Sequence, residues 1–152
     1  MRSGASKARP RARGAAKAKN VHRSPRAGPA LHGCDIVSFV ATKDPVRAKV
    51  FYRETLGLVL QAEDDFALVF DAHGIMLRVV SVQEVAAAQY TVLGWRVPDI
   101  AAAVDELRRA GVKFERYAGM GQDERGIWKS PAGGRIAWFK DPDGNTLSVT
   151  QF

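Results

Sequence analysis

Cysteine, histidine and long apolar runs are scarce in this sequence, and each shortage excludes a class of protein. The one cysteine, Cys34, allows no internal disulfide and no zinc site built on several thiolates. No apolar run approaches the ~20 residues of a membrane-spanning helix. No apolar segment follows the N-terminal charges, as one would in a secretory signal. We therefore expect a protein of the reducing cytoplasm that does not span a membrane.

Acidic residues are missing altogether from residues 1–30, which contain nine lysines and arginines. The remaining 14 basic residues are balanced by 16 acidic ones, so the net charge of +7 belongs to this stretch. Its few apolar side chains offer little burial to offset the entropy cost of ordering, so residues 1–33 are predicted to be a disordered basic tail. An organelle transit peptide and a nucleic-acid-binding arm stay open as alternatives. The arm has the weakest support, because no basic stripe or reading helix follows residue 30.

An internal repeat organises the rest of the chain, whose length suits one domain at residues 34–152. A strand at 35–41 is followed by a helix at 45–56, and a strand at 90–97 by a helix that ends at Gly111. Asp44 and Asp99, 55 residues apart, have the character of N-terminal helix caps.

The strands that follow each helix repeat as well, at an offset of 70 residues. Residues 66–80 and 136–150 both read as strand, turn, strand, with Asp71 matched to Asp141 and Gly74 to Gly144. The sequence therefore predicts two equivalent modules, 34–85 and 88–152. The second is longer between residues 112 and 134, where we expect a loop that is either a lid over a ligand or a simple surface excursion.

Three motifs resemble one known family. Residues 43–58 (KDPVRAKVFYRETLGL) resemble the helix signature of the vicinal-oxygen-chelate superfamily, the glyoxalase/bleomycin-resistance/dioxygenase-like proteins. Residues 97–112 resemble its second helix and residues 139–145 (FKDPDGN) its C-terminal turn. The resemblance implies an α+β fold of two tandem βαβββ modules whose curved sheets surround a cavity. It also implies pairing of chains, so a homodimer is expected.

Metal-dependent members of this family take four ligands from matched strand positions, and the resemblance places these on Val37, Val92, Arg78 and Ser148. Valine has no lone pair, arginine repels a cation, and one serine hydroxyl cannot hold a divalent ion. The histidines His22, His32 and His73 do not replace them. The expected protein binds no metal and no cofactor, which argues against the family's glyoxalase, ring-cleaving dioxygenase and fosfomycin-transferase chemistries.

Alternation along the strands predicts which side chains line the cavity. With Arg78 and Ser148 facing inward, the same face receives Leu68, Phe70, Trp138 and Lys140. The predicted ligand-binding residues are Val37, Phe39, Arg78, Val92, Arg96, Trp138 and Ser148 on the strands, with Tyr117 and Trp128 on the long loop. Arg78 can offer a bidentate fork to an anion and Trp138 a ring for stacking. The alternatives are an ion pair or an exit to solvent for Arg78 and plain packing for Trp138.

Two functions follow from these residues. The first is a metal-independent protein that binds or sequesters an anionic or aromatic small molecule. The alternative is a divergent lyase- or isomerase-like enzyme with Arg78 as electrophile and a loop tyrosine or the carboxylates Asp123 and Glu124 as acid and base. No catalytic residue is assigned.

Overall fold

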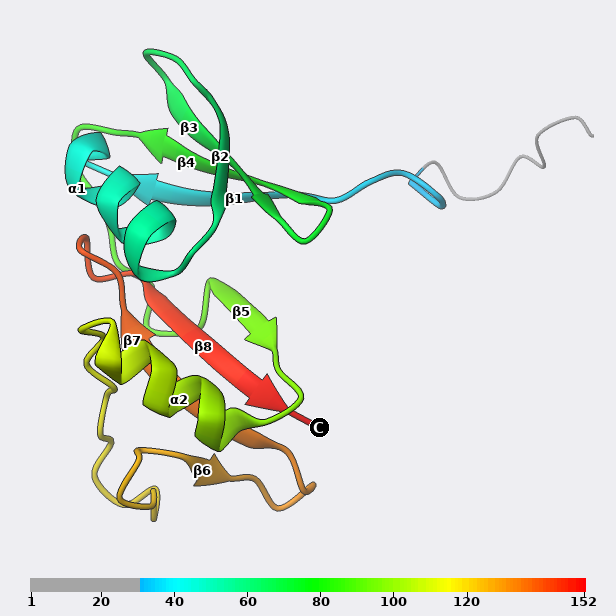
Figure 1. Cartoon of the computed structure of the whole chain (residues 1–152), viewed down its shortest axis with the longest axis vertical. Coiled ribbons are helices and arrows are strands. Elements are labelled where there is room, and N and C mark those ends of the chain that lie inside the picture. The colour runs from blue at the N-terminus through cyan, green and yellow to red at the C-terminus, as the bar shows by residue number, and fades with distance from the viewer. Residues whose placement is uncertain (1–30) are drawn as a thin grey trace, which may run out of the picture. The chain divides into compact units, whose positions relative to one another are not determined.

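Two four-stranded mixed sheets form the framework of the computed structural model, which describes residues 31–152 (Figure 1). Sheet A has the strand order β1-β4-β3-β2, with β1 parallel to β4 and the other neighbours antiparallel. The elements of this first module are β1 (Val37–Thr42), α1 (Pro45–Val50), the π-helical turn η1 (Phe51–Thr55), β2 (Val59–Glu63), β3 (Ala67–Ala72) and β4 (Ile75–Ser81).

Sheet B repeats this arrangement in the second module, with the order β5-β8-β7-β6 and a parallel pair β5–β8. Its elements are β5 (Leu93–Arg96), α2 (Ile100–Arg109), β6 (Trp128–Lys129), β7 (Arg135–Lys140) and β8 (Thr146–Gln151). The predicted α+β fold of two related modules is confirmed. Internal contacts group Asp35–Phe152 into one compact unit. Of the predicted basic tail, residues 1–30 lie outside the described part of the chain.

Both helices begin at the aspartates that the sequence indicated as caps. The Asp44 carboxylate accepts a hydrogen bond from the Arg47 amide at 3.0 Å, and Asp99 does the same for Ala102 at 3.1 Å. Between residues 31 and 152 no helix is long and apolar enough to cross a bilayer.

The two hairpins have turns of different length. As a result, the side chains of one strand in sheet A point to the opposite side from the one predicted. The β3–β4 hairpin closes from Ala72 to Ile75 over two residues, His73 and Gly74, both with positive φ (56° and 84°). This is the geometry of a type I′ turn. The β7–β8 hairpin instead closes from Lys140 to Thr146 over a five-residue turn.

The pairing within sheet A is therefore shifted by one residue relative to sheet B, and a one-residue shift turns every side chain of a strand to the other face. Arg78 pairs with Val69 in sheet A, whereas Ser148 pairs with Trp138 in sheet B. The prediction that Leu68 and Phe70 share the Arg78 face is wrong. Phe70 lies on the helix side, with its ring centroid 5.8 Å from that of Tyr52.

A buried polar cluster joins the first helix to the last turn. The Tyr52 hydroxyl donates to the Asp141 carboxylate at 2.8 Å, and the Asn145 amide donates both to Asp141 at 2.7 Å and to the carbonyl of Ala41 at 2.8 Å. The Thr42 hydroxyl donates to Asp143 at 2.6 Å. Tyr52 belongs to the helix motif and Asp141 to the turn motif, so two segments 89 residues apart in sequence meet here.

Candidate functional site

The Ser148 side of sheet B, called here the Trp138 face, brings together most of the predicted ligand-binding residues. Trp138 pairs with Ser148, and Ser148 pairs on its other side with Gly94. A Cβ atom at Gly94 would lie 2.8 Å from the Ser148 hydroxyl oxygen, so a larger residue there would require the Ser148 side chain to rotate away. Gly94 itself is exposed, whereas Ser148 is buried.

Three aromatic rings contact one another on the Trp138 face. The Tyr117 ring meets the Trp138 ring edge-on at a centroid distance of 5.7 Å, and the Trp128 ring lies tilted against it at 6.0 Å. The indole N–H of Trp138 donates to the Thr91 hydroxyl at 3.1 Å, which fixes the orientation of the central ring. The alternation of β7 indicated Trp138, but no sequence signal pointed to Thr91, because it lies in the segment between the modules.

Polar groups surround these rings. Burial, followed by the negative charge of Glu115, raises the pKa of Tyr117, so its phenol is a neutral hydrogen-bond donor at neutral pH. The half-buried Lys140 donates to the Thr146 hydroxyl at 2.6 Å. The Arg96 guanidinium lies 5.9 Å from the centre of the Phe152 ring, in cation–π geometry. The face therefore combines planar apolar surface with cationic neighbours.

Val92 lies just before β5, where its amide donates to the carbonyl of Thr146 at 2.9 Å. It is half-buried and packs against the core.

The remaining predicted residues lie on sheet A, on the side called here the Arg78 face. Val37 pairs with Met76, and Phe39 with Arg78. Phe39 is 60% exposed and Val37 and Met76 are 41% exposed, an unusual amount of apolar surface for one side of a sheet.

Arg78 itself is half-buried and forms no hydrogen bond or ion pair with any residue from 31 to 152. The pKa of Asp64 is lowered chiefly by hydrogen bonds from the Phe66 and Ala67 amides and, to a smaller degree, by the charge of Arg78. Its guanidinium donors are available to a ligand.

The two faces are carried by different sheets. The cavities of about 480 and 300 Å³ elsewhere in the chain share only Arg96 with the predicted ligand-binding set. Sequence reasoning assigned Arg78 and Trp138 to one cavity, and neither lines these two cavities.

The four positions that the resemblance matches to the family's metal ligands carry poor donors for a metal ion. They hold Val37, Val92, Arg78 and Ser148, which together provide one neutral oxygen donor and one fixed positive charge. Within residues 31–152 no three His, Cys, Asp or Glu side chains gather in a way that could hold a metal. No catalytic step is therefore derived through a metal.

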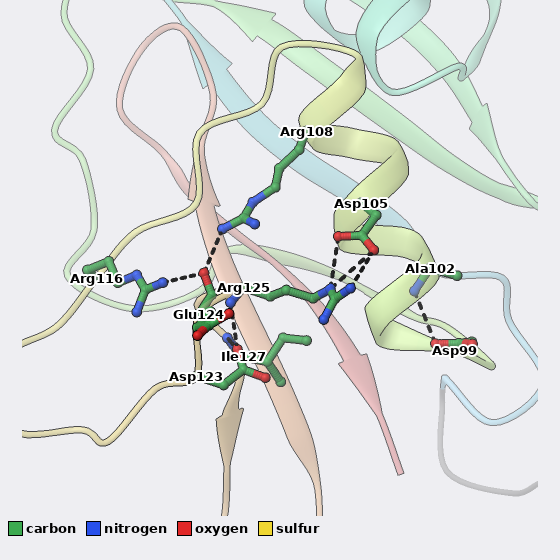
Figure 2. A network of polar contacts seen from close by, with 9 residues as sticks. All are labelled: Asp99, Ala102, Asp105, Arg108, Arg116, Asp123, Glu124, Arg125 and Ile127. Carbon is green, nitrogen blue, oxygen red and sulfur yellow. Dashed lines mark hydrogen bonds and ion pairs between the residues drawn. The ribbon is translucent and has the colours of Figure 1, made fainter.

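The long loop of the second module is attached to α2 by a network of polar contacts (Figure 2). The Arg125 guanidinium pairs with Asp105 at 2.9 Å, and Arg108 donates to the carbonyl of Glu124 at 3.2 Å. The Asp123 carboxylate accepts the amides of Arg125 and Ile127, both at 2.9 Å. The Asp123 carboxylate thus stabilises the conformation of its own loop. This role makes it a weaker candidate for a general base.

Each sheet has the same strand order, and in each module a capped helix follows the first strand. The sequence model of the Glyoxalase/Bleomycin resistance protein/Dioxygenase superfamily matches residues 34–149, and the chain belongs to this superfamily. No curated protein sequence matches it.

Solved structures with this fold are distant in sequence. A lactoylglutathione lyase from Agrobacterium tumefaciens is 19% identical, with a TM-score of 0.59 over 78% of this chain and 93% of its own. A superfamily member from Sphaerobacter thermophilus DSM 20745 is 19% identical, with a TM-score of 0.61 over 78% and 96%. Likeness at this identity establishes the fold alone.

Proposed function

We propose that this chain is a small-molecule-binding member of its superfamily that works without a metal and holds a planar, anionic ligand. The observation that carries the proposal is the contact of Tyr117, Trp128 and Trp138 on one open face. Stacked rings bind planar molecules of many kinds, and nearby guanidinium or ammonium groups select those that carry a carboxylate or phosphate. The single cysteine leads us to place this activity in the reducing cytoplasm.

We propose further that a second copy of the chain completes the site. The Arg78 face of sheet A exposes Phe39, Val37 and Met76, and burying them against the Trp138 face of a partner would remove this apolar surface from water. In such a homodimer each cavity takes Arg78 from one chain and Trp138 from the other. This assembly would allow Arg78 and Trp138, which lie on different sheets, to contact the same ligand.

Binding of 2-naphthoate, with 2-naphthylmethanol as its neutral counterpart, tests the proposal. Isothermal titration of the full chain should give a lower dissociation constant for the anion. Arg78→Met should weaken the anion about tenfold or more, the cost expected for a charge-assisted hydrogen bond, and should leave the alcohol unchanged. Equal affinities for the two probes, or an unaffected Arg78→Met protein, would contradict the anionic site.

Mixing two inactive variants separates the homodimer from binding within one chain. Arg78→Met and Trp138→Leu each damage every site when present alone. If each site uses one residue from each partner, a mixed dimer regains one intact site, and the mixture should recover part of the lost binding. If subunit exchange is verified and the mixture still shows no recovery of binding, the shared site is ruled out.

An enzymatic function has one specific observation in its favour. Tyr117 contacts Trp138, and its phenol O–H can donate a hydrogen bond or a proton to a molecule bound on this face. A divergent lyase or isomerase would then use Arg78 to stabilise developing negative charge. Turnover that survives EDTA and disappears in Tyr117→Phe, with ligand affinity retained, would favour this alternative over simple binding.

A further inference from the structure

A cavity of about 480 Å³ lies on the helix side of sheet B, away from both faces described above. Trp95 and Val149 pair with each other in the sheet and form part of its floor, with Phe139 beside them. Because Gly94 and Ser148 point to the Trp138 face, the alternation of the strands puts Trp95 and Val149 on the opposite side. The cavity is therefore separated from the proposed ligand face by the sheet itself.

Small residues keep this cavity open. Ala103 of helix α2 and Ala110, which directly follows this helix, contribute to the wall. Gly57, two residues after the end of η1, also lines the cavity, and a Cβ added there would meet no atom within 4 Å. The rings of Trp95 and Phe139 stack at a centroid distance of 6.5 Å and an interplanar angle of 20°. The half-buried Trp95, backed by the fully buried Phe139, therefore gives the cavity an aromatic floor under a space large enough for a small organic molecule.

The charged groups around the cavity are mainly negative. Glu54 and Glu106 line it, and Arg96 is the one cation among its lining residues. The charge of Arg96 is directed to the Phe152 ring, 5.9 Å away. Glu106 forms no side-chain hydrogen bond or ion pair within residues 31–152, and Glu54 pairs only with its exposed neighbour Arg53, at 3.2 Å. Both carboxylates are exposed at the rim of the cavity, and a bound cation would meet Glu106, unpaired among residues 31–152, and Glu54 shared with Arg53.

The backbone adds to this negative field. Residues 54–57 of the lining lie at and just after the end of η1, and the last carbonyl groups of a helix carry partial negative charge. An indole ring also attracts a cation over its face. Carboxylates, helix carbonyls and the Trp95 ring therefore favour the same kind of ligand.

We propose that this cavity binds an organic cation with an apolar body, that is, an amine that carries an aromatic or aliphatic group. The apolar part lies on the Trp95–Phe139 floor and the ammonium lies near Glu54 and Glu106. This site is independent of the anion site proposed on the Trp138 face. Neither its ligand class nor its lining residues overlap with that proposal, except for Arg96 at the boundary.

The test compares 2-phenylethylamine with its neutral counterpart 2-phenylethanol on the full-length chain. Two-dimensional ¹H–¹⁵N NMR titration gives both the affinity and the location. We expect the amine to bind more tightly and to shift the Trp95 indole and the amides of Gly57 and Leu107, while the Trp128 and Trp138 indoles stay unchanged.

Three variants complete the experiment. Glu106→Gln keeps the shape and removes the charge, so it should weaken the amine about fivefold, near the upper end for a partly exposed ion pair, and leave the alcohol unchanged. Ala103→Leu fills the cavity and should weaken both probes. Glu124→Gln, an exposed loop carboxylate outside the cavity, should change neither.

Several results would overturn the proposal. Equal binding of amine and alcohol would remove the cation selectivity. Shifts centred on the Trp128 and Trp138 indoles would place the probe on the other face. Residues 1–30 or a second copy of the chain could also fill the cavity. Trp95 would then be protected from solvent in the unliganded protein and no probe would bind, and this result too would refute the proposal.

Discussion

Sheet A and sheet B have the same strand order, yet their corresponding faces differ in character. The Trp138 face of sheet B carries three touching aromatic rings and hydroxyl groups, whereas the Arg78 face of sheet A carries exposed apolar side chains around one arginine. The difference begins in the hairpins. A two-residue turn in sheet A and a five-residue turn in sheet B set the pairing one residue apart.

This comparison shows how an internal repeat can diverge without a change of topology. The matched positions Leu68 and Trp138 point to opposite sides of their sheets, so an aromatic residue on β7 reaches the open face while its counterpart on β3 joins the core. One module can therefore gain a half-buried aromatic residue at a position where the other keeps an aliphatic core residue.

The largest expected difference between the modules is the loss of folding stability when the matched turn aspartates, Asp71 and Asp141, are replaced. Asp141 is buried and accepts hydrogen bonds from Tyr52, from the side chain and amide of Asn145, and from the Asp143 amide. Asp141→Ala leaves these donors unpaired and should lower the free energy of unfolding by about 3 kcal/mol. Asp71 accepts one bond, from the exposed Gly74 amide, so Asp71→Ala should cost about 1 kcal/mol or less.

Urea unfolding followed by circular dichroism measures both values. Equal losses in the two variants would show that the buried cluster of Asp141 has no special part in joining the modules.

Replacing Trp138 with leucine, the residue at the matched position of sheet A, should reduce the affinity for 2-naphthoate about fivefold to tenfold. The loss follows from the removal of a stacking surface worth about 1 kcal/mol or slightly more. The control is Trp95→Phe, on the opposite side of sheet B, which should leave this affinity unchanged. A larger effect from Trp95→Phe would place the anion in the helix-side cavity instead.

Tyr52 should make stability fall at high pH. Its burial and the neighbouring charge of Asp141 raise its pKa far above the usual value of about 10. Above that pH the unfolded chain loses the proton while the folded chain keeps it, so the free energy of unfolding falls by up to about 1.4 kcal/mol per pH unit. Tyr52→Phe should reduce this slope.

The control for the alkaline slope is Tyr90→Phe, since Tyr90 is exposed. Unfolding curves between pH 9 and 11 that have the same pH dependence in wild type and Tyr52→Phe would contradict the assignment.

The smallest change in folding stability is expected when the exposed ion pairs are removed. Arg125 and Asp105 pair with half their side-chain surface exposed, and the hydrogen bond and charge of Arg125 lower the pKa of Asp105. Arg125→Ala should change the free energy of unfolding by less than about 1 kcal/mol, and less again in 1 M salt. Arg53→Ala in the first module, which removes the pair with Glu54, should have an equally small effect. A loss of several kcal/mol in Arg125→Ala would mean that the loop network supports the whole second module.

Local signals in the sequence predicted much of the fold. The caps Asp44 and Asp99 start the helices because short polar side chains satisfy free amides wherever they occur. Strand alternation correctly put Trp138 and Ser148 on one face, since both are close to the same turn.

Local sequence signals could not predict features that depend on contacts between distant parts of the chain. The face of Leu68 and Phe70 was wrong because it depends on the turn geometry at His73 and Gly74, where one residue of register decides the outcome. The contact of Tyr52 with Asp141 joins residues from different modules, and no local pattern reveals it. The attachment of the long loop to α2 through Arg125 was likewise not visible in its composition.

The central claim is that this member of the superfamily binds its ligand without a metal, and elemental mass spectrometry of full-length protein purified without chelators tests it most directly. With valine, valine, arginine and serine at the four ligand positions, we expect zinc, iron, nickel and manganese each far below one equivalent per chain. One equivalent of any of these metals, retained through gel filtration and lost in the presence of EDTA, would contradict the account.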